Sequence, residues 1–592
     1  MSVKHNLFFL SPLALLLLAF LPGDVPYRFP LSTRTALSGT FGELRNDHFH
    51  AGLDIKTGGV TGVPIYSVAD GYVYRIRVGP YGFGRALYVR HPDRNYAIYG
   101  HLDGFNEVID AYLRENQYDT RQYSQDLYLP PGQIPVKTGD LIAYSGNSGS
   151  SQGPHLHFEI RDSDDRVLNP MEWYRDRISD TRKPLVQEIA IEPIDADARI
   201  NGAFAKYYTT PTGSSGFYTL PSVPVVRGRV GIEFRGYDLL DSAENACGIT
   251  RARLYVDEQL AWEYDLRVLS FDDTRYINLH TDFAVWKRER KRMQKAYMDF
   301  GNELPAYRSN AARGMIEIHD ELEHTFRLEL EDLHGNRSYV NGKLKGSTAP
   351  DKELPAFPVS GAAPKVSWEL RRNTLIVYAE KPLASWRGGL PYRNVLGEEK
   401  LLMPSTFQGG KLAYILPLDP YNYPEVVRDP AGRVLFDFYF RSEIMPDRNN
   451  LAEDGELQVF FPYSSVFDRV SLQIRRIPGD AGMYSDRFVI GDTHIPLRKP
   501  YLVSFKSLKK GNLSHMVVAK REGGGWKYAG NVLGEDENVY VSMQEFGEFC
   551  LMADSLPPSV RPLNFSTSRV PAGQQNISLR VDDSFSGIDH LS

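Results

Sequence analysis

The sequence has few cysteines, little net charge and no long apolar run after its first residues. Cys247 and Cys550 are its two cysteines, so neither a disulfide framework nor a cysteine-based zinc site is available. Lys and Arg number 68 against 74 Asp and Glu, and the net charge of −6 excludes a chain built to bind nucleic acid. Beyond the N-terminus no segment reaches about 18 consecutive apolar residues, which excludes a multi-pass membrane protein. Any metal must therefore be held by histidine and carboxylate.

The N-terminus has the pattern of an export signal. Lys4 precedes an apolar stretch from Leu7 to Leu21, which is shorter than the ~20 residues of a membrane-spanning helix and fits the apolar region of a signal peptide. We expect residues 1–23 to be a signal peptide and the mature protein to be exported to the periplasm or cell envelope. No clean A-x-A cleavage site follows, so an uncleaved anchor is the alternative. Only in that case do we expect the protein to contact a membrane.

The rest of the sequence is dominated by strand and turn patterns. Its 592 residues correspond to three to five domains of roughly 100–200 residues each, and its 42% hydrophobic residues are typical of a soluble globular chain. Alternating residues predict strands at 72–78, 85–90 and 96–101, and a hairpin is predicted where 366–370 and 375–378 flank a turn. We predict a mainly β protein, with an N-terminal antiparallel β-sheet domain followed by several Ig-like β-sandwich domains.

Changes in pattern set the expected domain boundaries. Two proline-rich segments, Ala349–Pro364 and Leu556–Pro558, have the composition of linkers. The expected division is an N-terminal domain at 24–185, a β-sandwich with a helical insertion at 186–348, β-sandwiches at 349–450 and 451–556, and the truncated start of a further β domain at 557–592.

Two segments depart from the β pattern. Residues 286–298 hold six Lys and Arg and are predicted to form a short helix. We interpret its basic side chains either as a solvated face or as a docking surface for an anionic cell-wall polymer or membrane. Residues 103–131 are polar and too long for an ordinary connection. We expect them to form a lid or wall of a groove, or else a surface elaboration packed against the next domain.

Half of the 14 histidines lie in the first 157 residues, and three short motifs contain four of them. In His155-Leu156-His157-Phe158-Glu159 the polar residues alternate with apolar ones, so on a strand both imidazoles and the carboxylate point to one face. In His50-Ala51-Gly52-Leu53-Asp54 an imidazole and a carboxylate are four positions apart, and Gly52 permits close backbone approach. His101 follows a predicted strand. Taken singly, each motif is also typical of an exposed strand, a chance spacing or a surface residue.

The motifs become specific in combination. One imidazole, one carboxylate and a second imidazole give zinc three protein ligands and leave a fourth position for water, which is the open coordination of a hydrolytic site. The sequence has no H-E-x-x-H glutamate, so proton transfer falls to histidine, whose unperturbed pKa of about 6.5 suits that role.

The order of these motifs resembles the M23 family of zinc metallopeptidases, the lysostaphin-like or LytM-type cell-wall endopeptidases. Phe41-Gly42 precedes the first motif, Ala69-Asp70-Gly71 lies between the motifs, and Gly146-Asn147-Ser148-Gly149 leads into the last one. The resemblance covers roughly residues 35–165. It implies an M23-type zinc peptidase domain that acts on peptidoglycan.

The resemblance also implies a role for each residue. His50, Asp54 and His157 correspond to the family's metal ligands, while His155 and His101 correspond to residues beside the metal water and the substrate oxygen. We assign His155 as general base and His101 as the group that hydrogen-bonds the developing oxyanion, with the two roles shared or exchanged as the alternative. Glu159 is expected to orient His157. Asp47 and His48 are expected to be rim residues.

The resulting hypothesis is an exported zinc metalloendopeptidase that hydrolyses peptide cross-links of bacterial peptidoglycan, with Zn²⁺ as cofactor and stem peptides or cross-bridges as its partners. One alternative is a non-catalytic scaffold or activator of the same fold that binds peptidoglycan or a partner hydrolase. A third reading is an adhesin or surface-assembly protein whose function lies in the sandwiches. The sandwiches carry no motif that indicates a reaction.

Overall fold

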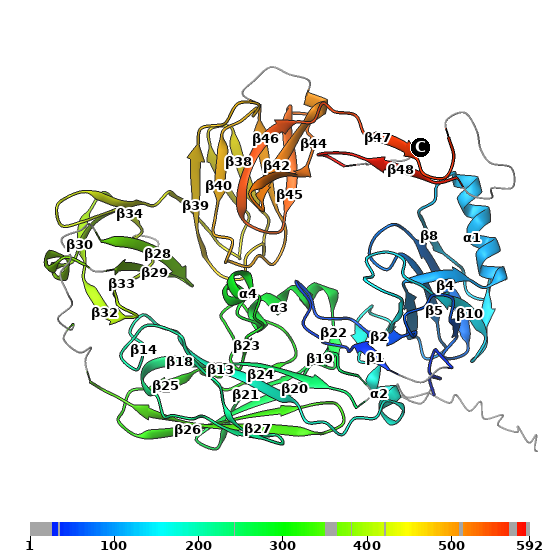
Figure 1. Ribbon diagram of the computed structural model, residues 1–592, viewed down its shortest axis with the longest axis horizontal. Coiled ribbons are helices and arrows are strands. Elements are labelled where there is room, and N and C mark those ends of the chain that lie inside the picture. The colour runs from blue at the N-terminus through cyan, green and yellow to red at the C-terminus, as the bar shows by residue number, and fades with distance from the viewer. Residues whose placement is uncertain are drawn as a thin grey trace, which may run out of the picture.

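The protein folds into successive β units, which Figure 1 shows following one another around a ring-like arc from blue to red. The computed structural model describes residues 26–587 apart from 33–35, 242, 350–353, 355–363, 381, 420–421, 508–512 and 567–576. The expected signal peptide lies outside the described residues. The fold is mainly β with predominantly antiparallel pairing, as predicted. Within the described part, no helix is both long enough and apolar enough to cross a membrane.

The first unit is built on an antiparallel sheet that carries the histidine motifs. Its main path runs β1 (Leu37–Gly39), β2 (Leu53–Lys56), β11 (His155–Arg161), β6 (Tyr96–Gly100), β5 (Arg85–Arg90), β4 (Gly71–Val78) and β8 (Gln125–Tyr128), with β9 (Pro135–Val136) beside β4 and β12 (Val167–Leu168) beside β11. A smaller sheet contains β3 (Pro64–Tyr66), β10 (Leu141–Ser145) and β7 (Leu102–Phe105). On β11, Leu156, Phe158 and Ile160 pack in the hydrophobic core while His155 and His157 lie beside Asp54, so the predicted alternation of this strand is confirmed.

The polar segment at 103–131 is not a lid, and this expectation is wrong for its main part. It contains helix α1 (Glu107–Thr120), which begins after Asn106, whose side chain accepts a hydrogen bond from the Ile109 amide. Ile109 and Leu113 are buried in the same core cluster as Leu156 and Phe158. Those two residues point away from the histidine face of β11, so the helix belongs to the core. The polar composition of the segment did not predict this helix, because two buried side chains are enough to anchor one face of an otherwise solvated helix.

Replacing Ile109 with alanine is expected to lower the free energy of unfolding by about 2–5 kcal/mol, because the side chain is fully buried and its loss leaves a cavity. The neighbouring Val108 is 63% exposed and provides the matched control, since Val108→Ala removes almost no buried area. Chemical denaturation of the full-length protein measures both effects, with the unfolding transition of the first unit as the observed signal. Equal effects of the two substitutions would contradict the packing of α1 against the core.

The second unit is the largest, and its core is continuous with the rim of the first. Phe41, Phe49 and Val167 of the first unit are buried in the second unit's core cluster. In addition, β12 pairs with β22 (Val268–Leu269), which follows β21 in the chain. Helix α2 (Met171–Tyr174) and the 3₁₀ helix η1 (Arg175–Arg177) connect the two units. The first two units are therefore joined by a shared hydrophobic core rather than by a bare linker.

The strands of the second unit form one extended set of pairings. They are β13 (Leu185–Pro193), β14 (Arg199–Ile200), β15 (Tyr207–Thr209), β16 (Thr212–Ser214), β17 (Phe217–Thr219), β18 (Val225–Leu239), β19 (Ala246–Cys247), β20 (Arg251–Val256), β21 (Gln259–Asp265), β23 (Gln294–Lys295), β24 (Tyr307–Ser309), β25 (Ile316–Ile318), β26 (Glu323–Glu331) and β27 (Arg337–Gly346), whereas β22, among the described strands, pairs only with β12. Its helices are η2 (Phe271–Tyr276), α3 (Ile277–His280) and α4 (Phe283–Glu289). The helical insertion thus falls between β22 and β23.

The predicted helix at 286–298 is wrong beyond its first turn. Helix α4 ends at Glu289, where Arg290 adopts the left-handed conformation with φ of 59°, and the chain then forms β23, which pairs with β18. The basic side chains have partners within the protein: Lys287 lies 3.0 Å from Glu545 and Arg288 lies 3.7 Å from Glu369. Because Glu545 and Glu369 belong to later units, these two cations connect parts of the protein.

The third and fourth units are each two sheets around one core. The third unit has one sheet of β28 (Lys365–Arg371), β29 (Thr374–Glu380), β33 (Lys411–Pro417) and β32 (Pro404–Gln408), a second sheet of β31 (Glu399–Leu402), β30 (Leu390–Asn394), β34 (Pro424–Arg428) and β35 (Val434–Asp437), and the 3₁₀ helix η3 (Ala384–Gly388). The β28–β29 hairpin confirms the predicted strands at 366–370 and 375–378.

The fourth unit and a terminal hairpin complete the described chain. One sheet of the fourth unit contains β36 (Phe440–Ile444), β39 (Val470–Ile477), β40 (Arg487–Ile490), β46 (Gly547–Ala553), β42 (Met516–Glu522) and β43 (Gly525–Gly530), the other contains β37 (Asn450–Asp454), β38 (Leu457–Phe461), β41 (Tyr501–Lys506), β45 (Asn538–Met543) and β44 (Val532–Leu533), and η4 (Leu513–His515) precedes β42. Its first strand therefore begins before the expected boundary at position 450. Strands β47 (Ser559–Pro562) and β48 (Leu579–Asp582) pair with each other.

Candidate metal centre

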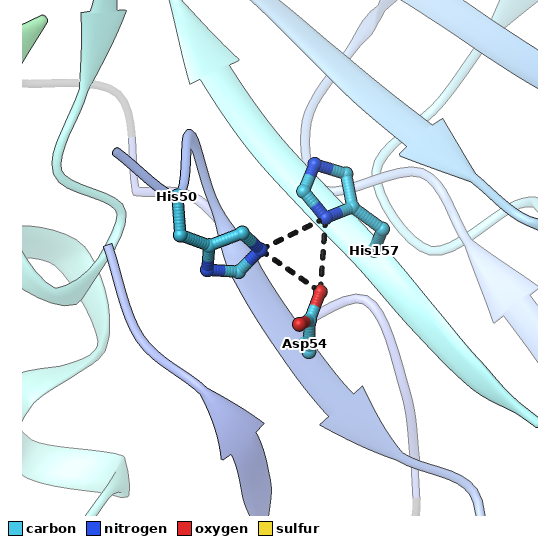
Figure 2. Close-up of side chains that lie close together, drawn as sticks. All are labelled: His50, Asp54 and His157. Carbon is cyan, nitrogen blue, oxygen red and sulfur yellow. Dashed lines mark hydrogen bonds and ion pairs between the residues drawn. The ribbon is translucent and has the colours of Figure 1, made fainter. Parts of the chain in front are cut away.

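The sheet of the first unit brings the three histidine motifs to one place. Asp54 on β2 is the direct partner of His157 on β11, and His157 in turn faces Gly100 at the end of β6, next to His101. Side chains of directly paired residues share a face of a sheet, so strand pairing alone places the motifs together. His50 precedes β2 and turns back toward the same point. Figure 2 shows His50, Asp54 and His157 pointing toward one another.

The atoms of this cluster lie at distances that suit a shared metal ion. Asp54 Oδ1 is 2.9 Å from His157 Nδ1 and 3.1 Å from His50 Nε2. The two ring nitrogens are 3.3 Å apart. Two atoms bound to one tetrahedral zinc at about 2.1 Å lie about 3.4 Å from each other. All three residues are buried, and this donor set of two imidazoles and one carboxylate fits a divalent metal.

Hydrogen bonds on the far side of each ring fix which nitrogen faces the cluster. His50 Nδ1 lies 2.8 Å from the Thr40 carbonyl, which can only accept, so this nitrogen carries the proton and Nε2 presents its lone pair. His157 Nε2 donates in the same way to Glu159 Oε1 at 2.9 Å, which leaves Nδ1 for the cluster. Glu159 is held in turn by Arg161 at 2.7 Å. Such outer partners orient metal-binding histidines.

His155 and His101 lie beside the cluster. In each of these rings, as in His50, Nδ1 donates a hydrogen bond to a backbone carbonyl. His155 Nδ1 donates to the Gly153 carbonyl at 2.8 Å, and its Nε2 lies 3.4 Å from Asp54 Oδ1. His101 Nδ1 donates to the Ser148 carbonyl at 2.9 Å. The two rings are 4.8 Å apart between centroids. His101 also has φ of 59°, a left-handed conformation that costs energy for a non-glycine residue and is typical of functional sites.

The electrostatics of the cluster favour a cation. Burial alone would raise the pKa of Asp54, but hydrogen bonds with His155, His157 and His50 hold it well below its usual range. Burial lowers the pKa of His50 and, with the charge of the nearby His157, lowers the pKa of His101 to about 4. Burial also lowers the pKa of His157, yet its hydrogen bonds to Asp54 and Glu159 outweigh this and raise it to about 9. A bound metal would take the place of that proton on His157.

Several contacts of this site carry no sequence motif. The Phe83 ring stacks on His157 at 5.0 Å between centroids, and Arg45 lies 2.8 Å from the outer oxygen of Asp54. Phe83 lies in the glycine-rich turn after β4, which was visible as a turn but not as part of a site. Gly52 does permit close approach, since a Cβ there would lie 2.4 Å from the Phe158 carbonyl oxygen.

Asp47 and His48 lie outside the cluster. Their side chains are about half exposed, at 58% and 51%, and they pair with each other at 2.8 Å. His48 therefore offers a histidine in the same segment as His50 whose replacement leaves the cluster untouched.

Replacing Glu159 with glutamine is expected to weaken metal binding about 10–100-fold, because it removes the charge that orients and polarises His157. Titration of the purified protein against a coloured chelator measures the change. Glu115→Gln, on the exposed face of α1, is the matched control. An unchanged metal affinity of Glu159→Gln would show that Glu159 pairs with Arg161 but does not orient His157 for metal binding.

The comparisons with known proteins fall on two parts of the chain. The model of Peptidase family M23 matches residues 48–170, and that of the Zu5-like domain matches residues 442–554. An uncharacterized metalloprotease of Haemophilus influenzae is 31% identical over 150 residues, which are 24% of this chain and 26% of the relative. The peptidoglycan DD-endopeptidase ShyB of Vibrio cholerae is 33% identical over 111 residues, 19% of this chain and 20% of the relative.

A solved structure adds a further likeness. The zinc-containing peptidase from Vibrio cholerae is 28% identical, with a TM-score of 0.19, over 25% of this chain and 39% of that chain. The chain spans about a quarter or less of the length of these two curated relatives.

Proposed function

Because residues 48–170 form a Peptidase family M23 domain, we propose that this chain is an exported zinc metalloendopeptidase that hydrolyses peptide cross-links of bacterial peptidoglycan. The observation that carries the proposal is the convergence of His50, Asp54 and His157, with His155 and His101 directly beside them. The name of the ShyB relative, a peptidoglycan DD-endopeptidase, supports the substrate class. Export rests on the apolar stretch from Leu7 to Leu21.

His50 Nε2, Asp54 Oδ1 and His157 Nδ1 would hold the zinc ion. Zinc bound there supplies Lewis-acid chemistry, in that it polarises the scissile carbonyl and lowers the pKa of water from 15.7 to about 7. Thr40 and Glu159 keep the two imidazoles in the tautomers that this binding needs.

His155 and His101 carry the proton transfers in this mechanism. Each ring donates through Nδ1 to a backbone carbonyl, so each presents a basic Nε2. His155 is the better general base by position, because Asp54 Oδ1 lies 3.4 Å from its Nε2 and stabilises the imidazolium that forms.

The water proton moves to His155 as the water oxygen adds to the carbonyl carbon. His101, protonated at Nε2, donates a hydrogen bond to the oxygen that becomes negative, and the C–N bond then breaks as the proton taken up by His155 passes to the leaving amine.

The sheet face beside the site suits an anionic peptide. Tyr74, Tyr88 and Tyr96 form an aromatic cluster on the face that carries His157, and arginines cover it. The Arg75 guanidinium lies 4.9 Å from the centroid of Tyr88, and that of Arg90 lies 5.6 Å from Tyr96. Arg75 is already paired with Asp126 at 2.6 Å, so Arg90 is the arginine of this face that is suited to bind a carboxylate of a stem peptide.

Incubation of the purified, zinc-loaded chain with isolated peptidoglycan sacculi tests the function. We expect cross-linked muropeptides to decline and monomers to accumulate, with a chelator stopping the reaction. Binding of the zinc-loaded protein to sacculi without any change in muropeptides would overturn the enzymatic proposal and favour the scaffold.

A further inference from the structure

A second group of acidic side chains lies where the M23 domain meets the second unit. It consists of Asp180 after η1, Asp238 on β18, and Asp332 and His334 in the turn between β26 and β27, and is called the junction cluster below. Ligand atoms of Asp180, Asp332 and His334 all lie within 4.8 Å of one another. Asp238 lines the same small cavity. The cluster shares no residue with the centre described above.

The carboxylates of the junction cluster are buried without neutralising partners. The Asp180 side chain is 0% exposed, and Asp238 is 3% exposed. Asp180 Oδ2 and Asp238 Oδ1 have no hydrogen-bond partner among the described residues. Within the same part of the chain, no ion pair joins a Lys or Arg to Asp180, Asp238 or Asp332. A buried charge is retained only when it is paired or binds a metal, so this arrangement calls for a cation.

His334 presents a lone pair to the cluster. Its Nε2 donates to the carbonyls of Ile178 and Arg175 at 2.7 and 3.2 Å, so the proton is on Nε2. The opposite nitrogen, Nδ1, lies 3.8 Å from Asp180 Oδ2. That distance is too long for a hydrogen bond. Two lone pairs that face each other repel. A cation bound by both atoms removes that repulsion.

The cavity at the cluster has room for one ion. Its volume is about 20 Å³, and Asp180, Asp238, Asp332 and His334 all contribute to its lining. A space of about 10–15 Å³ measured in this way holds one water-sized species. Thr40 lines the same cavity while its carbonyl accepts from His50, so the cluster lies directly behind the first centre.

We propose that the junction cluster binds one divalent transition-metal ion, Zn²⁺ or Mn²⁺, through Asp180, Asp332 and His334, while Asp238 lines the same cavity. An imidazole nitrogen among carboxylates favours these ions over Ca²⁺, which prefers oxygen ligands alone. Asp180 comes from the end of the segment that follows the M23 domain, and Asp332 and His334 come from the β26–β27 turn. The ion therefore fastens the M23 domain to the second unit. This site does not depend on the proposed hydrolysis.

Metal analysis of five purified full-length proteins, each equilibrated separately with zinc and with manganese and then desalted, tests the proposal. Wild type is expected to hold two equivalents with zinc, one in each centre. His157→Ala is expected to keep one, Asp180→Asn to keep one, and the double variant to keep none. Asp180→Asn is nearly isosteric and changes a buried side chain without leaving a cavity, so we expect it to fold. Asp164→Asn, whose side chain is 72% exposed, is the matched control.

This set of variants tests the two proposed metal sites independently of each other. Loss of all metal in His157→Ala, or equal metal content in His157→Ala and the double variant, would overturn the junction site. If instead wild type held one equivalent that Asp180→Asn lost and His157→Ala kept, the junction site would stand and the proposed zinc centre would fall. In the His157→Ala background the bound ion should raise the melting temperature, and His334→Gln should abolish that rise. Uptake of calcium alone would overturn the assignment to a transition metal.

Discussion

His157→Ala is expected to remove the metal from the M23 domain and to lower peptidoglycan hydrolysis by at least about 10³-fold. His157 Nδ1 lies 2.9 Å from Asp54 Oδ1 and 3.3 Å from His50 Nε2, so its loss leaves one imidazole and one carboxylate. Two protein ligands rarely retain zinc against a chelator. Without the ion, water returns to its ordinary pKa and the nucleophile is lost.

The substitution should leave the fold largely intact. Glu159, which loses its partner, keeps its ion pair with Arg161 at 2.6 Å. Metal analysis and the initial rate of muropeptide release measure the two expected losses. His48→Ala provides the control, because that histidine is about half exposed and pairs with Asp47, away from the ligand cluster. Hydrolysis by His157→Ala at the wild-type rate would refute the assignment of this residue as a ligand.

His155→Ala and His101→Ala are expected to keep the metal and to lose hydrolysis by about 10²–10⁴-fold each. Both rings lie next to the ligand cluster with a basic Nε2, and neither is needed to complete the set of three ligands. Removal of a general base or of a hydrogen bond to the oxyanion typically costs this much in rate.

The pair of measurements separates binding from catalysis. Metal content is determined first on each variant, and the rate of cross-link cleavage is then compared at equal metal occupancy. Near wild-type cleavage by either variant would refute its catalytic role. Loss of metal in His155→Ala would instead make His155 a ligand, a role that its distance of 3.4 Å from Asp54 Oδ1 would explain.

The local sequence pattern predicted the wrong structure for two segments in which a few side chains decide what is buried. Residues 103–131 were predicted to form a lid or wall because they are polar, yet Ile109 and Leu113 anchor a regular helix in the core. Residues 290–298 read as helix because of their Lys and Arg, but Met293 and Tyr297 are fully buried there, and the chain pairs with β18. In both segments the contacts that decide the structure come from residues distant in sequence, which outweigh local propensity.

The sequence by itself determined the β architecture and the faces of the strands that carry the histidines, because a strand's two-residue period places alternate side chains on opposite faces whatever lies around it. Leu156 and Phe158 are accordingly buried, and His155 and His157 point the other way, beside Asp54. Only the tertiary structure decided what surrounds those side chains. Phe83 on His157 and the junction cluster assembled from Asp180, Asp238 and His334 follow from strand pairing and from a core shared between units. Contacts between residues so far apart have no fixed spacing in the sequence, so no motif could reveal them.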